Sequence, residues 1–265
     1  MLHNYHGIVD RIYDKLKEID TLKNELDGLR PLDPEQIKSL KTLFDVDFTY
    51  NSTAIEGNTF SYQETKVVLL DGITIGGKSV REHLEIINHK EAIDYIEELA
   101  GKKKTDFKRS DILNIHSIIL KGIDQKNAGV YRTVPVFVML KNGTKRMFCD
   151  PLLIGDEMDG FFDWLYAESD EHPLIIAVEA HTRFVNIHPF IDGNGRTARL
   201  IMNLILLEAG YVPVIIKNSE RVRYLDSLEQ WQNNNKEDFC NIVVDCEKES
   251  LEIYLKTIRE KIIWK

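Results

Sequence analysis

One stretch of twelve residues, 188–199, limits what this chain can fold into more than any other part of the sequence. It reads HPFIDGNGRTAR, and an apolar run with helical spacing, residues 200–207, follows it directly. The glycines at its centre let the backbone turn tightly and point successive N–H groups outward. At the start of a helix, such N–H groups and the helix dipole form a phosphate site. The stretch therefore predicts an anion-binding turn carried by a packed helix.

The ionisable side chains of this stretch suit chemistry on a nucleoside triphosphate. A histidine such as His188 has a reference pKa of about 6.5, so it can take a proton from an attacking hydroxyl at neutral pH. Asp192 offers hard oxygen ligands, and Mg²⁺ usually reaches a protein through one or two carboxylates plus substrate phosphates. Arg196 and Arg199 lie three residues apart on the first helical turns and can supply forked donors to the far phosphates. Together these residue types indicate phosphoryl or nucleotidyl transfer.

Other sites that this stretch could form fit the sequence less well. A calcium loop of the EF-hand type requires an acid or Asn at Arg196, Gly at Thr197 and Glu at Asn203. His181 and His188 match no zinc-ligand spacing, and the sequence contains no H-E-x-x-H. It also contains no G-x-x-x-x-G-K-[ST], which excludes a P-loop nucleotide site.

Composition limits the class of protein and its partners. The chain of 265 residues is 43% hydrophobic, enough for a substantial core, and its net charge of −9 argues against a general nucleic-acid binder. Three cysteines without a C-x-x-C motif suit a reducing compartment, so a cytoplasmic location is expected. The N-terminus has no apolar signal region and no stretch approaches eighteen apolar residues, so neither secretion nor a membrane span is expected.

Helix start and stop signals divide the first hundred residues. Residues 5–28 carry apolar side chains at helical spacing, and Asp33-Pro34-Glu35 combines an N-cap, a first-turn proline and an acid. The second helix is expected to run towards Glu56 and stop at Gly57, with a break near Asp47 left open. Two capping boxes, which begin at Ser61 and Ser79, predict helices near 62–70 and 80–100, with Gly101 as a stop.

The remainder of the chain is helical except at one point. The runs Val134–Leu140 and Lys145–Cys149 are rich in β-formers and are joined through Asn142-Gly143, a strong hairpin signal. Helices are expected around residues 112–119 and 158–165, from His172-Pro173 onwards, and over 238–262. The sequence therefore predicts a mainly α fold with one β-hairpin, which must pack on the helices because an isolated hairpin is only marginally stable.

The stretch 188–199 resembles the signature of the Fic family, H-x-F-x-[DE]-G-N-G-R-x-x-R, at every fixed position. The resemblance implies a helical Fic-type domain whose hairpin, called the flap, lies beside the active site. It also implies transfer of AMP from ATP to a hydroxyl of a target protein, the reaction called AMPylation. The roles that it implies are a general base (His188), a Mg²⁺ ligand (Asp192), a phosphate cradle (Gly193, Asn194 and Gly195), phosphate support (Arg196) and a grip on the γ-phosphate (Arg199).

A second resemblance lies before the signature. Residues 52–58, STAIEGN, resemble the inhibitory motif [ST]-x-x-x-E-[GN] of the Fic class that has an N-terminal inhibitory helix. The resemblance implies that Glu56 pairs with Arg199 and excludes the γ-phosphate, while Ser52 helps to hold the helix. An Arg–carboxylate fork would compete for the donors that ATP needs. On the local pattern alone, Glu56 fits a solvated surface position equally well.

Three further segments resemble the family. Two of them are residues 72–96 and residues 129–132, which directly precede the hairpin. The resemblance implies that the flap, residues 134–149, would hold a segment of the target protein as an added strand. Residues 223–243 resemble the family's adenine-side helix, in which Tyr224 and Gln232 would border the base. That segment departs from the common pattern at Leu225 and at Asn234-Asn235, and a core or surface role for Tyr224 stays open.

The expected organisation is one Fic-type domain over residues 1–265. Its parts would be an N-terminal helical segment (1–30), an inhibitory helix region (34–58), a catalytic core (about 110–243) and a C-terminal helix (238–265). The expected activity is that of a protein adenylyltransferase using ATP and Mg²⁺, with Mn²⁺ left open, under inhibition by Glu56. The alternatives are removal of AMP with Glu56 positioning water, transfer of another group, and a closed nucleotide-sensing protein without turnover. A homodimer is common among relatives, although this sequence shows no diagnostic interface.

Overall fold

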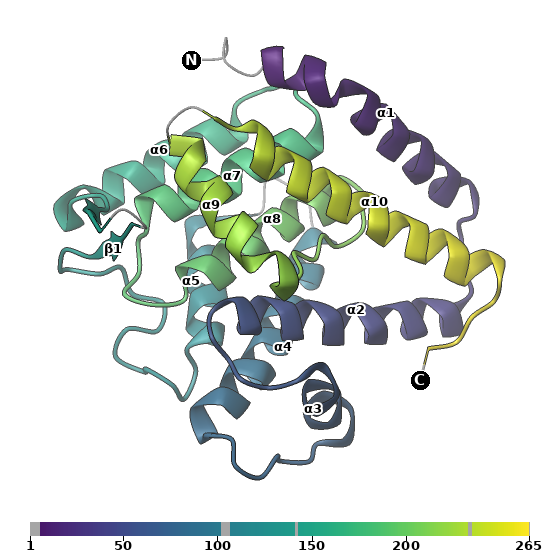
Figure 1. The fold of residues 1–265 in the computed structure, drawn as a ribbon, viewed down its shortest axis with the longest axis horizontal. Helices are drawn as coiled ribbons and strands as arrows, with labels where there is room; N and C mark the ends of the chain where they lie inside the picture. The colour runs from purple at the N-terminus through teal and green to yellow at the C-terminus, as the bar shows by residue number, and fades with distance from the viewer. Residues whose placement is uncertain (1–5, 102–106, 141–142, 233–234, 265) are drawn as a thin grey trace.

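The structure is a computed structural model that describes residues 6–101, 107–140, 143–232 and 235–264, with the backbone alone at residues 6–11 and 232. These residues form ten α-helices and one antiparallel pair of strands (Figure 1). The prediction of a mainly α fold with one hairpin is therefore confirmed. Within the described ranges, no helix is both long enough and apolar enough to cross a bilayer.

The elements follow one another along the chain, and a long connection, residues 120–136, separates α5 from β1. The helices are α1 (His6–Gly28), α2 (Pro34–Ile55), α3 (Tyr62–Lys66), α4 (Val80–Ala100), α5 (Arg109–Ile119), α6 (Ile154–Tyr166), α7 (Pro173–Ile187), α8 (Asn194–Glu208), α9 (Arg221–Gln232) and α10 (Glu237–Arg259). The strands are β1 (Phe137–Met139) and β2 (Lys145–Met147), and a short π-helix (Val67–Asp71) extends α3. In Figure 1, α1 runs along α10 at one side of the molecule and the hairpin lies at the opposite side.

Helix α8 lies at the centre of the fold. It packs against α7 along its length and also contacts α4, α5 and α2. Its residues from Arg196 to Leu206 are all buried, because the run 200–206 is apolar on every face except Asn203. Each buried Leu, Ile or Met in it contributes roughly 1.5–3 kcal/mol. Packing on all sides fixes the first turn of α8, which carries the residues that the sequence singles out.

Helix α2 begins at the predicted start signal. The side chain of Asp33 accepts hydrogen bonds from the backbone N–H groups of Glu35 and Gln36, at 2.9 and 3.2 Å, and Pro34 occupies the first turn. The helix then continues through Asp47, so the break considered there is absent. At this end the amide of Gln36 donates to two carbonyls at the end of α10.

The other end of α2 is closed by a glycine-dependent cap. The N–H of Asn58 donates to the carbonyl of Thr53, at 3.1 Å, and the N–H of Gly57 donates to that of Ala54, at 3.0 Å. This is the Schellman arrangement, which needs a left-handed residue at Gly57, whose φ is 101°. The cap places Glu56 at the C-cap position of α2, next to α8.

Contacts with the segment before α9 hold this end of α2 in place. Asp47 pairs with Lys217 at 2.6 Å, and Asn51 accepts from the N–H of Asn218 at 2.8 Å. Arg221 donates from Nε to the carbonyl of Ile55, at 2.7 Å, which satisfies one of the carbonyls that every helix end leaves without an internal partner. Both ends of α2 are therefore held by the C-terminal third of the chain.

The structure confirms the predicted capping boxes, but the strands of the hairpin are shorter than predicted. Both capping boxes are confirmed, at Ser61 with Glu64 and at Ser79 with Glu82. The strands are shorter than the predicted runs, since β1 and β2 pair only over Phe137–Met139 and Lys145–Met147. Two further backbone bonds, from Phe148 N–H to the carbonyl of Val136 and from Leu140 N–H to that of Thr144, flank the paired residues. Asn142, half of the predicted turn, lies outside the described residues.

Candidate active site

The loop before α8 is closed by the side chain of Asn194. Its amide donates to the carbonyl of Phe190 at 2.9 Å, and its oxygen accepts from the N–H of the same residue at 3.0 Å. Gly193, with φ of 78°, precedes it as the N-cap of α8. The first N–H groups of a helix have no carbonyl partner inside it, and they carry the positive end of the helix dipole. The residues that the sequence predicts as a cradle thus form a preorganised turn for an anion.

A carboxylate lies directly on this turn. Oε1 of Glu56 lies so close to Gly195 that a Cβ atom added to this glycine would overlap it. No side chain separates the carboxylate from the turn. Nη2 of Arg199 donates to the same oxygen at 2.7 Å. Glu56 is 40% exposed, whereas Arg199 is 2% exposed, so the acid reaches inward from the rim of the site. The predicted pair is therefore in contact, at the position where the turn would receive an anion.

Arg199 is held by partners on two sides. Ser52 accepts from Nε at its hydroxyl, at 3.0 Å, and from Nη2 at its carbonyl, at 2.8 Å. On the other side, Nη1 donates to the hydroxyl of Tyr224 at 3.2 Å. Burial opposes the charge on Arg199, but Tyr224 and Glu56 more than offset it, so the pKa of the guanidinium is raised. Arg199 is thus a charged, buried and fully engaged group.

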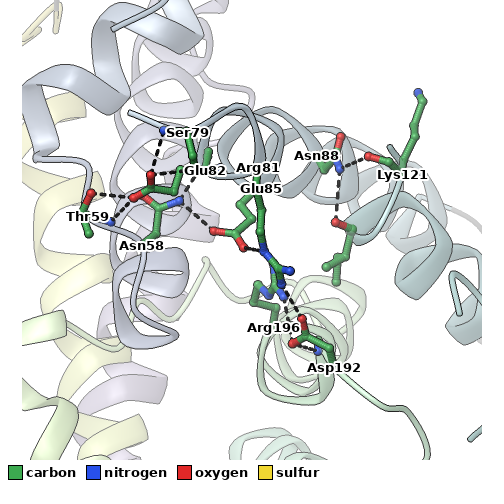
Figure 2. A network of polar contacts seen from close by, with 12 residues as sticks. Asn58, Thr59, Ser79, Arg81, Glu82, Glu85, Asn88, Lys121, Asp192 and Arg196 are labelled. Carbon is green, nitrogen blue, oxygen red and sulfur yellow. Dashed lines mark hydrogen bonds and ion pairs between the residues drawn. The ribbon is translucent and has the colours of Figure 1, made fainter. Parts of the chain in front are cut away.

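Asp192 is a second charged group at the start of α8. Its Oδ1 accepts from the N–H of Gly193 at 2.6 Å and from Arg196 at 3.3 Å, and its Oδ2 accepts from Arg81 at 2.8 Å (Figure 2). Burial raises the pKa of this carboxyl, but Arg196, the Gly193 N–H and Arg81 outweigh it, so its pKa is lowered. Asp192 is therefore ionised at neutral pH.

A polar network connects Asp192 to the segment after Glu56. Arg81, near the start of α4, also donates to Glu85 at 3.1 Å, and Glu85 accepts from the amide of Asn58 at 2.9 Å (Figure 2). The same amide donates to the carbonyl of Glu82 at 3.1 Å. Asp192 and the segment that follows Glu56 are therefore tied to one short run of α4.

The chemistry of Asp192 fits a hard divalent cation. Within the described residues, no group of three or more His, Cys, Asp or Glu side chains could hold a metal ion. A Mg²⁺ here would therefore take this one carboxylate together with phosphate and water oxygens, which is its usual mode of binding. The ion would require Oδ2 of Asp192, since Oδ1 already accepts from Gly193 and Arg196.

His188 ends α7 in a left-handed conformation, with φ of 52° and ψ of 59°. That backbone is strained for a residue other than glycine. Its ring stacks on Phe148, with centroids 3.8 Å apart, and its Nδ1 lies 3.3 Å from the carbonyl of Val185. Because a carbonyl only accepts, Nδ1 carries the proton and Nε2 keeps its lone pair. Burial, opposed by this hydrogen bond, lowers the pKa of His188 to about 4, so the ring is neutral at pH 7.

Arg132 is a site residue whose contacts the sequence does not reveal. It is 3% exposed, and its guanidinium donates to the carbonyls of His188 (2.8 Å), Val134 (2.9 Å) and Cys149 (2.6 Å). One side chain thus ties both ends of the hairpin to the backbone of His188. Its place in a segment that resembles the family was the only signal for it.

His116 is a second residue that sequence reasoning missed. Its Nδ1 accepts from the N–H of Gly129 and its Nε2 donates to the carbonyl of Asp192, both at 2.9 Å. The ring stacks on Phe190 with centroids 3.5 Å apart and an angle of 1°. Burial lowers its pKa to about 4, so it stays neutral. A histidine on the apolar face of Ile112, Ile115 and Ile119 was the available signal.

The structure brings most of the predicted site residues together around the first turn of α8. Ser52, Glu56 and Tyr224 all contact Arg199, and Arg196 contacts Asp192. Tyr224 is 1% exposed, which excludes the surface role left open for it, and its place beside the adenine stays a prediction. Gln232 ends α9, and its side chain lies outside the described residues.

Comparison with protein families and curated proteins identifies relatives over most of the chain. The profile of the Fic/DOC family matches residues 106–206. The protein adenylyltransferase Fic of Culex quinquefasciatus is 34% identical over 252 residues, which are 94% of this chain and 49% of that protein. The protein of the same name from Nematostella vectensis is 36% identical over 208 residues, 78% of this chain and 48% of that one. This chain thus spans about half the length of these curated relatives.

Solved structures extend the similarity to the whole fold. A Fic domain containing signalling protein from Bacteroides thetaiotaomicron has a TM-score of 0.86 at 30% identity, over 93% of this chain and 98% of that one. Fic-1 from C. elegans has a TM-score of 0.82 at 31% identity, over 94% of this chain and 73% of that one. Fold and site define a mainly helical protein whose central helix begins with a glycine-rich anion turn. The chain belongs to the Fic/DOC family.

The contacts of Arg132 predict a stability effect that is coupled to the hairpin. Arg132→Met keeps the length of the side chain but leaves three carbonyls without their donor. At 1–3 kcal/mol for each buried group left unpaired, with partial replacement by water, we expect a loss of about 2–4 kcal/mol. This corresponds to a drop in Tm of roughly 5–10 °C. Amide exchange in β1 and β2 should also become faster.

Arg223→Met is the matched control, because Arg223 is an exposed arginine of α9 that pairs with Glu220. It should leave both the Tm and the exchange of the strands unchanged. Equal effects of the two substitutions would contradict the assignment of Arg132 as the tie between the hairpin and His188.

Proposed function

We propose that this protein is an adenylyltransferase that transfers AMP from Mg·ATP to a Ser, Thr or Tyr hydroxyl of a target protein. The curated relatives that carry the name protein adenylyltransferase Fic support this proposal. The observation that carries it is the buried Arg199 and the ionised Asp192 at the glycine turn that begins α8, with the neutral His188 at the end of the preceding helix.

The transfer is a displacement at the α-phosphate. The hydroxyl oxygen of the target forms a bond to the α-phosphorus, the bond from that phosphorus to the bridging oxygen of the β-phosphate breaks, and pyrophosphate leaves. Nε2 of His188 accepts the proton of the hydroxyl, which suits its lone pair and its neutral state. A pKa near 4 makes His188 a weak base, so Nε2 holds no proton at neutral pH and its lone pair stays available.

The other residues of the turn would bind the nucleotide. The backbone N–H groups of Gly193, Asn194 and Gly195 would cradle the phosphates, with Arg196 beside them and Arg199 on the γ-phosphate. Asp192 would hold Mg²⁺, which when bound neutralises charge between the α- and β-phosphates. In this proposal, each charged side chain of the signature has one place along the triphosphate.

We propose further that Glu56 inhibits the reaction. Its carboxylate contacts Gly195 and takes a hydrogen bond from Nη2 of Arg199, the same groups that the γ-phosphate needs. Two anions cannot share these donors, since their charges repel within a few ångströms. Release of the C-terminal turn of α2 would open the site, and Ser52 belongs to that turn.

The target protein would bind along the flap, residues 134–149. Among the described residues β1 pairs with β2 alone, so its other edge could take a target segment as an added strand, beside the exposed side chains of Phe137, Val138 and Met139. The proposal also includes a cytoplasmic location, which is supported by the three cysteines without a C-x-x-C motif. It includes a homodimer as well, for which the sequence shows no diagnostic interface.

The inhibitory role predicts a gain of activity on substitution of Glu56. Glu56→Gly removes the competing carboxylate, so we expect AMP transfer to rise at least tenfold, which corresponds to about 1.4 kcal/mol. Intact-protein mass spectrometry after incubation with Mg·ATP and cell lysate would detect the added AMP on the protein itself or on a target. Adding His188→Ala should abolish the adduct, because the hydroxyl then has no base.

Three outcomes would count against separate parts of the proposal. Equal labelling of the wild type and Glu56→Gly would contradict inhibition by Glu56 while leaving the transferase intact. ATP binding without any adduct in Glu56→Gly would favour a nucleotide-sensing protein. Loss of AMP from a previously modified target, faster with wild type than with Glu56→Gly, would favour removal of AMP as the activity.

The ion pair between Arg81 and Asp192 predicts an effect on metal dependence. Mg²⁺ would have to displace Arg81 from Oδ2, at the expense of a partly exposed pair worth up to about 1 kcal/mol. In the Glu56→Gly background, Arg81→Gln should therefore lower the Mg²⁺ concentration for half-maximal ATP binding by about 3- to 5-fold. Lys90→Gln, which removes a charge from the same helix at a distance from Asp192, should not. A higher Mg²⁺ requirement would show that Arg81 instead helps to bind the nucleotide.

A further inference from the structure

A buried pair of side chains lies behind Arg199, on the side away from α2. Tyr224 comes from α9 and His181 from α7, and they are 1% and 0% exposed. The hydroxyl of Tyr224 lies 3.2 Å from Nη1 of Arg199 and 2.9 Å from Nε2 of His181. Three helices that are distant along the chain therefore meet in one line of polar contacts inside the core.

The chemistry of the groups fixes the direction of these hydrogen bonds. A guanidinium has donors only, so the oxygen of Tyr224 accepts from Arg199. Among the described residues, the other partner of this hydroxyl is Nε2 of His181, so the hydroxyl proton is used only if Nε2 accepts it and the ring proton resides on Nδ1. Burial and the charge of Arg199 keep the pKa of His181 well below its usual range, which agrees with a neutral ring.

His181 keeps this role at a cost to the fold. Its Nδ1 is buried and has no hydrogen-bond partner among the described residues. An unpaired donor of this kind is unfavourable, and an apolar side chain would avoid it. In return, the histidine offers the hydroxyl of Tyr224 an acceptor inside the core, which an apolar side chain could not.

The contacts of Arg199 show what this acceptor does for the site. Ser52 binds Nε and Nη2, Tyr224 binds Nη1, and Glu56 binds Nη2 alone. When Glu56 leaves, Tyr224 still holds Nη1 through a contact that does not involve α2. Without this contact the guanidinium would be held from the Ser52 side alone, and a long arginine side chain held on one side keeps more rotamer freedom.

We propose that Tyr224 and His181 are positioning residues that aim Arg199 at the terminal phosphate of ATP. Tyr224 holds Nη1 through its hydroxyl, and His181 sets the direction of that hydroxyl. The pair touches neither the phosphates nor the reacting atoms. Its effect is therefore confined to nucleotides long enough to reach Arg199, and it makes the site selective for a triphosphate over a monophosphate. This inference rests on the proposed function, in which Arg199 binds the γ-phosphate.

Calorimetric titration of Mg·ATP and of AMP, in the Glu56→Gly background, tests the pair. Tyr224→Phe keeps the ring, and with it any packing against the base, but removes the hydroxyl. We expect ATP to bind about tenfold more weakly and AMP to bind within twofold of the parent. His181→Phe should reproduce the loss, and His181→Gln should restore ATP binding, because its amide oxygen can accept the proton of Tyr224.

Two further variants make the result specific. Tyr211→Phe is the matched control: Tyr211 is also buried and also donates its hydroxyl to a partner, Asp20, at 2.7 Å, but it does not contact Arg199. It should leave the ratio of the two affinities unchanged. Arg199→Gln is the reference for the γ-phosphate contact and should lower ATP affinity at least as much as Tyr224→Phe.

Each remaining outcome overturns a distinct statement. If Arg199→Gln weakens ATP and Tyr224→Phe does not, the positioning role is wrong and the proposed function stands. If Arg199→Gln leaves ATP affinity unchanged, the contact between Arg199 and the γ-phosphate is wrong, and the positioning role falls with it. If Tyr224→Phe weakens ATP and AMP equally, Tyr224 acts on the nucleoside or the fold rather than on Arg199.

Discussion

The arrangement of this site depends on one buried charge. Arg199 lies on a helix that is packed on all sides, and its guanidinium is 2% exposed. A buried charge is tolerated only when it is paired and hydrogen-bonded, so the fold must supply anionic or polar partners at that point. Ser52 and Glu56 supply them from α2, and Tyr224 supplies one from α9. If Glu56 withdraws, the buried charge of Arg199 loses its anionic partner, so the binding of another anion becomes favourable. In the proposed function, closure by Glu56 and binding of phosphate are thus two consequences of the same charge.

The rest of the site is held by backbone contacts rather than by side chains that meet a substrate. His116 joins the carbonyl of Asp192 to the segment that enters the hairpin, and Arg132 joins the carbonyl of His188 to both ends of the hairpin. The strained backbone of His188 persists because such contacts over-determine it. The hairpin, the base and the anion turn therefore form one connected unit. A change in the hairpin would reach His188 through Arg132.

Local signals in the sequence predicted much of the fold and the identity of the candidate site. Asp33-Pro34 and Gly57 marked the ends of α2, and two capping boxes marked α3 and α4, because each depends on hydrogen bonds within a few residues. The signature located the anion turn. The contact of Arg81 with Asp192 joins residues 111 positions apart, and the partners of Tyr224 come from two other helices, so no local pattern could reveal them. The strands were predicted too long because β-propensity marks residues that suit a strand but does not show where the pairing of two strands stops.

The central claim is that Glu56 and the terminal phosphate of ATP compete for the same edge of Arg199. A crystal structure of the Glu56→Gly variant with Mg²⁺ and a non-hydrolysable ATP analogue tests this most directly. The account predicts a γ-phosphate oxygen within hydrogen-bond distance of Nη2 of Arg199, with Nη1 still on Tyr224 and Nε2 of His188 facing the α-phosphate. A γ-phosphate bound elsewhere, with Arg199 still on Ser52 and away from the nucleotide, would contradict it.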